Sequence, residues 1–156
     1  MLKNINKNIK ILYVEDDEIA RENGVEYLQN FFEQIYEASD AIKALQLYEK
    51  YQPDIIITDI QMPKLNGLEF VKKIRQKDKK TQIIIITAFC DRDYLLKAIE
   101  LQLVKYLVKP VKEKEFEEAL FLCVNSLQED NSNIIKLDDN SYFDTFNKNL
   151  VIKNEI

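Results

Sequence analysis

The stretch at residues 55–67 reads IIITDIQMPKLNG. Its first four residues, Ile55–Thr58, are unbroken and apolar or β-branched, and Asp59 follows them directly. An unbroken run of this kind is typical of a strand buried on both faces of a parallel sheet. Four more short runs are mostly unbroken in the same way: Ile9–Val14, Ile35–Ala38, Ile83–Thr87 and Tyr106–Val108. The sequence therefore predicts five parallel strands.

Amphipathic segments alternate with these runs and predict helices. Apolar residues recur at helical spacing in four of them: Ala41, Ala44, Leu45 and Tyr48; Leu68, Val71 and Ile74; Leu95, Ala98 and Ile99; and Phe116, Ala119, Leu120, Cys123, Val124 and Leu127. Asp17 and Ser39 stand where N-caps of the first two helices are expected. Five successive strand–helix units predict a doubly wound α/β domain with right-handed crossovers.

The composition excludes several classes of site. The 156 residues include no His, which removes Ser-His-Asp and Cys-His nucleophiles. Two glycines are too few for a GxGxxG or GxxxxGK[ST] phosphate loop. A net charge of −5 argues against holding a nucleic-acid backbone by charge. With two cysteines and no apolar stretch long enough for a signal peptide or a membrane span, we expect a cytoplasmic protein with no membrane partner.

Polar residues follow the predicted strands, at the edge where ligands of such sheets bind. They are Glu15 and Asp16 after the first, Asp59 after the third, Thr87 at the end of the fourth and Lys109 after the fifth. Clustered carboxylates suit Mg²⁺, and a carboxylate beside that ion attacks phosphorus to form an aspartyl phosphate. Each residue alone has an ordinary explanation as a turn former, helix cap or loop residue. Their joint occurrence favours phosphoryl transfer onto Asp59.

Four segments, ILYVEDD, IIITDIQMPKLNG, IIIITAF and KYLVKP, resemble the receiver domain of two-component response regulators, over about residues 8–127. This resemblance implies a flavodoxin-like sheet of order 2-1-3-4-5 with helices on both faces. It makes Asp59 the phosphoacceptor and a sensor histidine kinase the partner. It assigns Mg²⁺ to Glu15, Asp16, Asp59 and the backbone carbonyl of Gln61. It also implies that Lys109 pairs with the phosphate ahead of a cis peptide bond to Pro110, and that Thr87 and Tyr106 form the switch.

The chain departs from the family pattern at the Glu15-Asp16 pair, where many members have Asp-Asp, at Gln102 and in the last helical segment, and Phe89 bears on the lifetime of the phosphoryl group. Gln102 stands where a Gly often ends the fourth helix, so the C-cap there is expected to be strained or absent. Phe89, two residues after Thr87, would exclude the attacking water and slow self-dephosphorylation. The last helical segment, residues 112–130, has no Arg, which puts in doubt the Arg-containing receiver homodimer that many winged-helix regulators form on phosphorylation.

Two alternatives compete with a phosphorylated receiver. An aspartate-nucleophile phosphatase of the haloacid dehalogenase type resembles DxDxT, but Gln61 stands two residues after Asp59. A pseudo-receiver that takes no phosphate is disfavoured because Asp16, Asp59, Thr87 and Lys109 are all present. We expect no enzyme activity beyond the chain's own Mg²⁺-dependent phosphorylation and dephosphorylation.

Residues 128–156 form a second region without a helical stripe. Three segments predict a short β-meander: Ile134–Leu137, Tyr142–Phe146 and Leu150–Ile152. The meander resembles the one that opens the winged-helix output domain of transcriptional response regulators. The sequence thus predicts the front part of a transcription factor, with DNA binding in a longer chain and not in this fragment. The alternative is a stand-alone receiver that acts through protein contacts.

Overall fold

In a computed structural model of the chain, which describes residues 7–88, 91–132, 134–136, 141–144 and 149–152, five parallel strands form a sheet of order β2-β1-β3-β4-β5. The strands are β1 (Lys10–Val14), β2 (Gln34–Ala38), β3 (Ile55–Thr58), β4 (Gln82–Thr87) and β5 (Lys105–Val108). The doubly wound, flavodoxin-like fold and its strand order are therefore confirmed. Phe89 and Cys90 lie outside the described residues, and so does the prediction made for Phe89.

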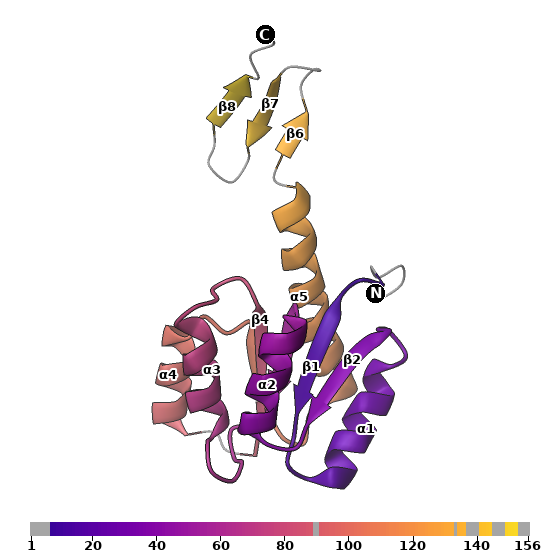
Figure 1. Cartoon of the computed structure of the whole chain (residues 1–156), viewed down its shortest axis with the longest axis vertical. Coiled ribbons are helices and arrows are strands. Elements are labelled where there is room, and N and C mark those ends of the chain that lie inside the picture. Colours follow the sequence, from indigo (N-terminus) through magenta and orange to yellow (C-terminus); the bar gives the residue numbers. More distant parts are fainter. Residues whose placement is uncertain (1–6, 89–90, 133, 137–140, 145–148, 153–156) are drawn as a thin grey trace. The chain divides into compact units, whose positions relative to one another are not determined.

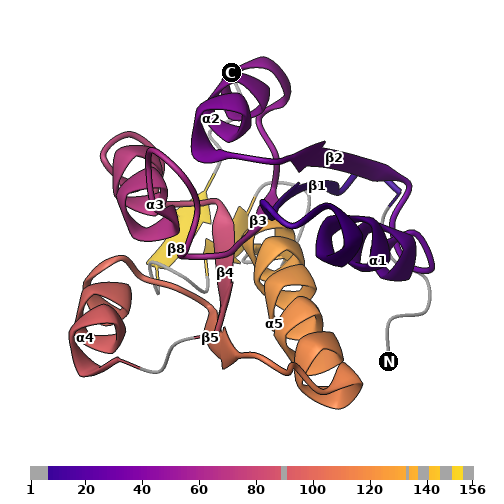
Figure 2. The ribbon, with the colours of Figure 1, turned by 90° about the horizontal axis from the view of Figure 1, so that it is seen from below.

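Helices cover both faces of the sheet (Figure 2). They are α1 (Glu18–Leu28), α2 (Ala41–Tyr51), α3 (Gly67–Arg75), α4 (Arg92–Glu100) and α5 (Glu113–Ser132). Helices α1 and α5 lie on one face, and α2, α3 and α4 lie on the other (Figure 2). All four residues of β3 are buried, as the unbroken run predicts for a central strand of a two-faced sheet. The arrowheads of β1 and β2 point the same way in Figure 1, as parallel pairing requires.

The helix caps confirm one prediction and correct another. Asp17 is the N-cap of α1, and its Oδ1 accepts a hydrogen bond from the Ala20 backbone N–H at 3.0 Å. The prediction of Ser39 as the N-cap of α2 is wrong by one residue. Asp40 takes that position with an extended backbone and accepts from the Lys43 N–H at 2.8 Å. The carboxylate lies three residues before that N–H, which is the spacing a capping side chain needs.

The apolar stripe predicted on the fourth helix is only partly buried. Ala98 is 4% exposed, but Ile99 is 76% exposed, so its assignment to the buried face is wrong. The stripes predicted on α2 and α3 are largely buried, at Ala41, Ala44 and Tyr48 and at Leu68, Val71 and Ile74. Helix α4 lies beside α3 at the end of its layer (Figure 2), so only a narrow side of it is covered.

Three short strands follow α5 and form a separate antiparallel sheet of order β6-β7-β8. They are β6 (Ile134–Lys136), β7 (Ser141–Asp144) and β8 (Asn149–Ile152), which matches the predicted meander. Of the predicted strand residues, Leu137, Thr145 and Phe146 lie outside the described residues. The chain divides into two compact units, Met1–Cys123 and Val124–Ile156. The change of character expected after Leu127 therefore falls inside α5, whose backbone remains helical to Ser132.

Candidate functional site

Three of the predicted site residues follow directly after strands of the sheet, and backbone hydrogen bonds fix each of them to a neighbouring strand. The Glu15 N–H donates to the Ala38 carbonyl at 3.1 Å, and the Asp59 N–H donates to the Val14 carbonyl at 3.1 Å. The Lys109 N–H donates to the Thr87 carbonyl at 2.7 Å. The ladder thus continues one residue beyond the strands, so that the side chains start from fixed points at one edge of the sheet.

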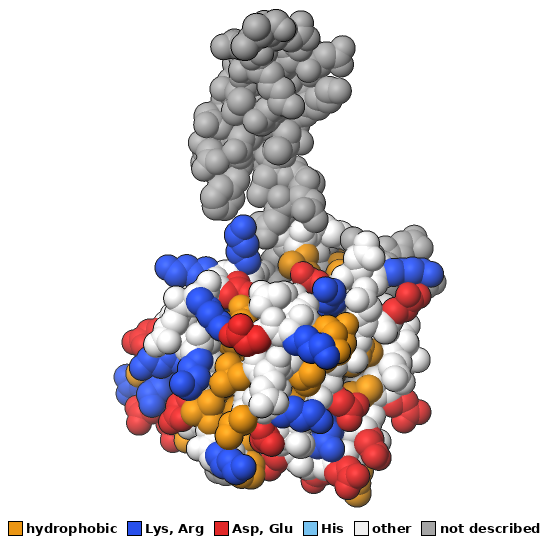
Figure 3. Space-filling model, in the orientation of Figure 1, with side chains coloured by type: hydrophobic (Ala, Val, Ile, Leu, Met, Phe, Trp, Pro, Cys, Tyr) orange, Lys and Arg blue, Asp and Glu red, His pale blue; other side chains and the backbone are white. Residues whose placement is uncertain are grey.

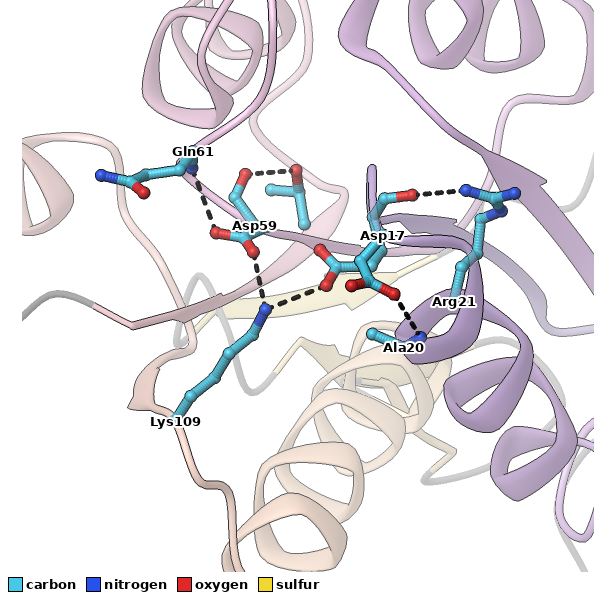
Figure 4. Close-up of polar contacts among 8 residues, drawn as sticks. Asp17, Ala20, Arg21, Asp59, Gln61 and Lys109 are labelled. Carbon is cyan, nitrogen blue, oxygen red and sulfur yellow. Dashed lines mark hydrogen bonds and ion pairs between the residues drawn. The ribbon is translucent and has the colours of Figure 1, made fainter.

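Lys109 bridges the two buried carboxylates of this edge (Figure 4). Its Nζ lies 2.7 Å from Asp59 Oδ2 and 2.9 Å from Glu15 Oε1. Asp59 and Glu15 are only 7% and 4% exposed, whereas the Lys109 side chain is 35% exposed. Two like charges this deeply buried require a cation between them. The predicted grouping of Glu15, Asp59 and Lys109 is what the structure has.

Asp16 completes a cluster of carboxylates. One carboxylate oxygen each from Glu15, Asp16 and Asp59 lies within 4.8 Å of the other two, and Asp16 is exposed at the mouth of the cluster. Among the side chains that the structure describes, Glu15 Oε2 is a buried oxygen without a hydrogen-bond partner. A buried acceptor in that state is expected to have a ligand. Oxygen donors of this kind fit a hard divalent cation such as Mg²⁺.

The ionisation of Glu15 and Lys109 reflects their burial and their mutual contact. Burial raises the pKa of Glu15 to about 7, an effect that the hydrogen bond from Lys109 opposes and the neighbouring Asp59 reinforces. Burial by itself lowers the pKa of Lys109, but its bonds to Asp59 and Glu15 outweigh this and raise the pKa above its usual value. Lys109 is therefore a permanent cation. A second cation at this cluster would favour the charged form of Glu15.

Backbone and side-chain bonds around Asp59 hold its carboxylate in one orientation. The Gln61 N–H donates to Asp59 Oδ1 at 3.1 Å, so the backbone of Gln61 lies beside the carboxylate (Figure 4). The Thr58 hydroxyl donates to the Asp59 carbonyl at 3.0 Å. Since Oδ2 faces Lys109, both oxygens of Asp59 have a fixed partner. The role predicted for the Gln61 carbonyl stays a prediction.

Two residues that support this site were missed in the sequence. A Cβ on Gly67 would lie 1.9 Å from the Asp59 carbonyl oxygen, so only glycine allows α3 to begin this close to the site. The Gly67 N–H also donates to the Ile60 carbonyl at 2.7 Å. Arg21 donates from Nη1 to the Glu15 carbonyl at 2.9 Å and thereby fixes the acidic loop from the first turn of α1 (Figure 4). Gly67 is the last residue of the segment IIITDIQMPKLNG, and its place in that segment is the feature by which the sequence could have identified it.

The remaining predicted residues lie on β4 and β5. Thr87 is the last residue of β4 and is fully buried. Tyr106 lies in β5, where it is partly buried and packs against the hydrophobic core. The Lys109–Pro110 peptide bond is cis, as expected. Gln102, after α4, has φ of 55°, so the left-handed conformation that usually calls for glycine is present without one. The switch roles of Thr87 and Tyr106 stay predictions.

Charged side chains of both signs are interspersed on the face drawn in Figure 3. This distribution is in keeping with the net charge of −5. Within residues 7–88 and 91–132, none of the helices combines the length and the apolar character that crossing a bilayer requires.

Comparison with known proteins shows which family this chain is similar to. The sequence model of the family described as "Response regulator receiver domain" matches residues 11–121. The transcriptional regulatory protein BtsR of Salmonella typhi is 38% identical over 114 residues, which are 72% of this chain and 46% of that protein. The chain spans about half the length of the curated relatives it matches.

Solved structures agree with the fold. The N-terminal domain of an uncharacterized protein from Wolinella succinogenes is similar with a TM-score of 0.72 and 37% sequence identity, covering 80% of this chain and 98% of that one. A response regulator receiver domain protein from Clostridium thermocellum is similar with a TM-score of 0.70 and 26% identity, covering 77% of this chain and 97% of that one.

Proposed function

This chain belongs to the response regulator receiver domain family of two-component systems, and on that premise we propose that Asp59 accepts a phosphoryl group from the phosphohistidine of a sensor histidine kinase, in a reaction that requires Mg²⁺. The observation that carries this proposal is the grouping of Asp59 with Glu15, Asp16 and Lys109 at the carboxyl edge of the sheet. In the reaction, the phosphorus–nitrogen bond of the donor breaks and a bond between phosphorus and an Asp59 carboxylate oxygen forms.

Asp59 suits the role of nucleophile because it is buried, oriented and paired with a cation. The Gln61 N–H and the Lys109 ammonium each hold one carboxylate oxygen, so the group needs little rearrangement to meet a phosphorus atom. Lys109 Nζ lies 2.7 Å from Asp59 Oδ2 and stays beside the carboxylate as negative charge moves onto the phosphoryl oxygens.

Glu15, Asp16 and Asp59 are the residues that would hold Mg²⁺, together with the Gln61 carbonyl. The cation, when bound, neutralises negative charge on the transferring phosphoryl oxygens. Glu15 supports this assignment because its Oε2 is buried without a partner and its pKa is about 7. Asp16 is exposed and gives the cluster access to solvent. Thr87 would bond the attached phosphoryl group, and Tyr106 would move with it as the switch.

The output that this switch controls is proposed from the relatives. BtsR is named a transcriptional regulatory protein, and the chain spans less than half of it. We therefore assign the chain to the receiver part of a transcriptional regulator; the receiver would form a homodimer on phosphorylation, and DNA binding would belong to the longer protein. By itself the chain would act in the cytoplasm and catalyse only its own phosphorylation and dephosphorylation. A receiver that acts through protein contacts alone is the alternative outcome.

Incubation with acetyl phosphate tests the proposal without the kinase. Intact mass spectrometry should show one added phosphoryl group in the presence of Mg²⁺ and none after chelation with EDTA. Asp59→Asn should abolish the addition, whereas Asp93→Asn, a change of an exposed carboxylate on α4, should leave it intact. Equal labelling of Asp59→Asn and the unaltered chain would refute the assignment.

A further inference from the structure

A cavity of about 400 Å³ lies between α1 and the start of α5, within the unit Met1–Cys123. Tyr13, Gly24, Ile86, Phe116 and the Lys109 side chain are among the residues that line it. Lys109, whose side chain bridges the two carboxylates of the site, is thus also one of the residues that line this cavity.

Tyr13 shapes the cavity through its contact with Gly24. A Cβ on Gly24 would lie 2.4 Å from the Cζ and the hydroxyl oxygen of Tyr13, which is far inside van der Waals contact. Gly24 lies in the interior of α1, where glycine weakens a helix relative to alanine. The tyrosine ring accounts for its presence, because the ring occupies the space that a side chain at position 24 would need. Helix α1 and the Tyr13 ring therefore hold each other in place.

Tyr13 is also close to the charges of the site in the chain and in space. It precedes Glu15 by two residues in the chain, and it lines the cavity together with Lys109. Burial, followed by the charge of Glu15, raises the pKa of Tyr13 to about 12, while Lys109 opposes the shift and Asp59 adds to it. Glu15, Lys109 and Asp59 are the three residues joined by the ion pairs of the site.

We propose that Tyr13 is a positioning residue, whose ring, packed against Gly24 in the cavity that Lys109 also lines, keeps the Lys109 ammonium between Glu15 and Asp59. The lysine side chain has a flexible four-carbon stem, and 35% of it is exposed, so without the ring it has room to leave its partners. The ring, and not the hydroxyl, does this. The inference rests on the proposed function, since it concerns the rate at which Asp59 is phosphorylated.

The test compares phosphorylation rates by acetyl phosphate at saturating Mg²⁺, with Mg²⁺ affinity measured separately by calorimetry. Tyr13→Ala should lower the rate constant about tenfold, because a misplaced group loses this much or more, and should not weaken Mg²⁺ binding, because Lys109 is not a metal ligand. Tyr13→Phe should keep the original rate. Tyr27→Ala is the matched control, because Tyr27 lines the same cavity but contacts Phe116 and Glu117. It should lower stability and leave the rate unchanged.

Gly24→Ala tests the contact from the other side. The added Cβ should displace the ring and slow phosphorylation as Tyr13→Ala does, and the double variant should be no slower than Tyr13→Ala alone. If the two substitutions acted independently, their effects on the phosphorylation rate would add. The inference is overturned if Tyr13→Ala reacts at the original rate, if Tyr27→Ala is equally slow, or if the two effects add. Circular dichroism shows that each variant compared is folded.

A crystal structure of Tyr13→Ala separates this inference from the proposed function. Lys109 Nζ should have left at least one of the two positions 2.7 Å from Asp59 Oδ2 and 2.9 Å from Glu15 Oε1. If both ion pairs persist, the positioning role is refuted. This measurement does not depend on phosphorylation. A chain that takes no phosphate would refute the proposed function, but the crystal structure would still show whether Tyr13 positions Lys109.

Discussion

Gly67 packs against the carbonyl of Asp59 so closely that a Cβ at position 67 would lie 1.9 Å from the carbonyl oxygen. The first residue of α3 and the residue proposed to accept the phosphoryl group are therefore in direct backbone contact. The Gly67 N–H is bound to the Ile60 carbonyl at 2.7 Å, which leaves the pair little freedom to separate. The position of Asp59 thus depends on the absence of a side chain eight residues later in the sequence.

Gly67→Ala should destabilise the fold and slow phosphorylation together. Backbone must move to admit the Cβ, so we expect a loss of about 2–4 kcal/mol in the free energy of unfolding, in the range of strongly strained substitutions. Urea unfolding followed by circular dichroism measures this loss. Glu69→Ala, an exposed change in the same helix, is the control and should stay within about 0.5 kcal/mol. A Gly67→Ala variant as stable as the unaltered chain would contradict the contact.

Lys109→Gln should separate metal binding from phosphoryl transfer. Because Lys109 occupies an oxygen of Glu15 and one of Asp59, its removal frees both carboxylates for a cation, and Mg²⁺ should bind at least as tightly as before. Phosphorylation should fall about 100-fold or more, since the loss of one preorganised charge at a transferring group has an effect of that size. Calorimetry and a phosphorylation time course measure the two quantities.

Lys112→Gln, an exposed lysine at the start of the last helical segment, is the control for that experiment. It should change neither the affinity for Mg²⁺ nor the rate. If Lys109→Gln bound Mg²⁺ much more weakly, Lys109 would be needed to build the metal site, contrary to our assignment.

Arg75 at the end of α3 caps the end of α4. Its Nε donates to the Leu101 carbonyl at 2.8 Å and its Nη2 to the Gln102 carbonyl at 3.1 Å. Arg75→Leu leaves these carbonyls without that donor, and we expect a loss of about 1–3 kcal/mol in the free energy of unfolding. Amide hydrogen exchange should accelerate in α4 more than in α2. Lys72→Leu, at an exposed position of α3, should neither lower the free energy of unfolding nor accelerate exchange in α4. Uniform acceleration in both helices would argue against a local cap.

Asp78 should make the fold sensitive to acid between about pH 4 and 2. Partial burial by itself raises the pKa of Asp78, but hydrogen bonds from Thr81, Tyr48 and the Lys80 N–H hold it at about 2, below the ordinary 3.8. A carboxyl with a lowered pKa in the folded state stabilises the fold above its unfolded pKa, and this stability is lost as the pH falls through the folded pKa.

Asp78→Asn should therefore be less stable than the unaltered chain at pH 6, and the difference should shrink as the pH falls from 4 to 2. Urea unfolding at a series of pH values measures the difference. A constant difference for Asp78→Asn would rule out the hydrogen bonds as its source of stability.

The sequence was most informative where the chemistry follows strand geometry. Parallel strands end at one edge, so Glu15, Asp59 and Lys109 could be grouped from the order of the strands alone. Gly67, Arg21 and the Tyr13 ring could not, because their importance comes from close approaches between segments that local patterns do not record. Periodicity likewise finds an apolar stripe but not what covers it. This is why Ile99 belongs to a predicted apolar stripe and is nevertheless 76% exposed.

Chemical mapping of the modified residue is the direct test of whether Asp59 is the phosphoacceptor. After reaction with acetyl phosphate and Mg²⁺, borohydride reduces an aspartyl phosphate to homoserine, and peptide mass spectrometry locates that residue. We predict homoserine at position 59, in the peptide that contains Asp59, and its absence when Mg²⁺ is chelated before the reaction. Homoserine at Asp16 or at another carboxylate, with Asp59 unmodified, would contradict the claim that Asp59 is the phosphoacceptor.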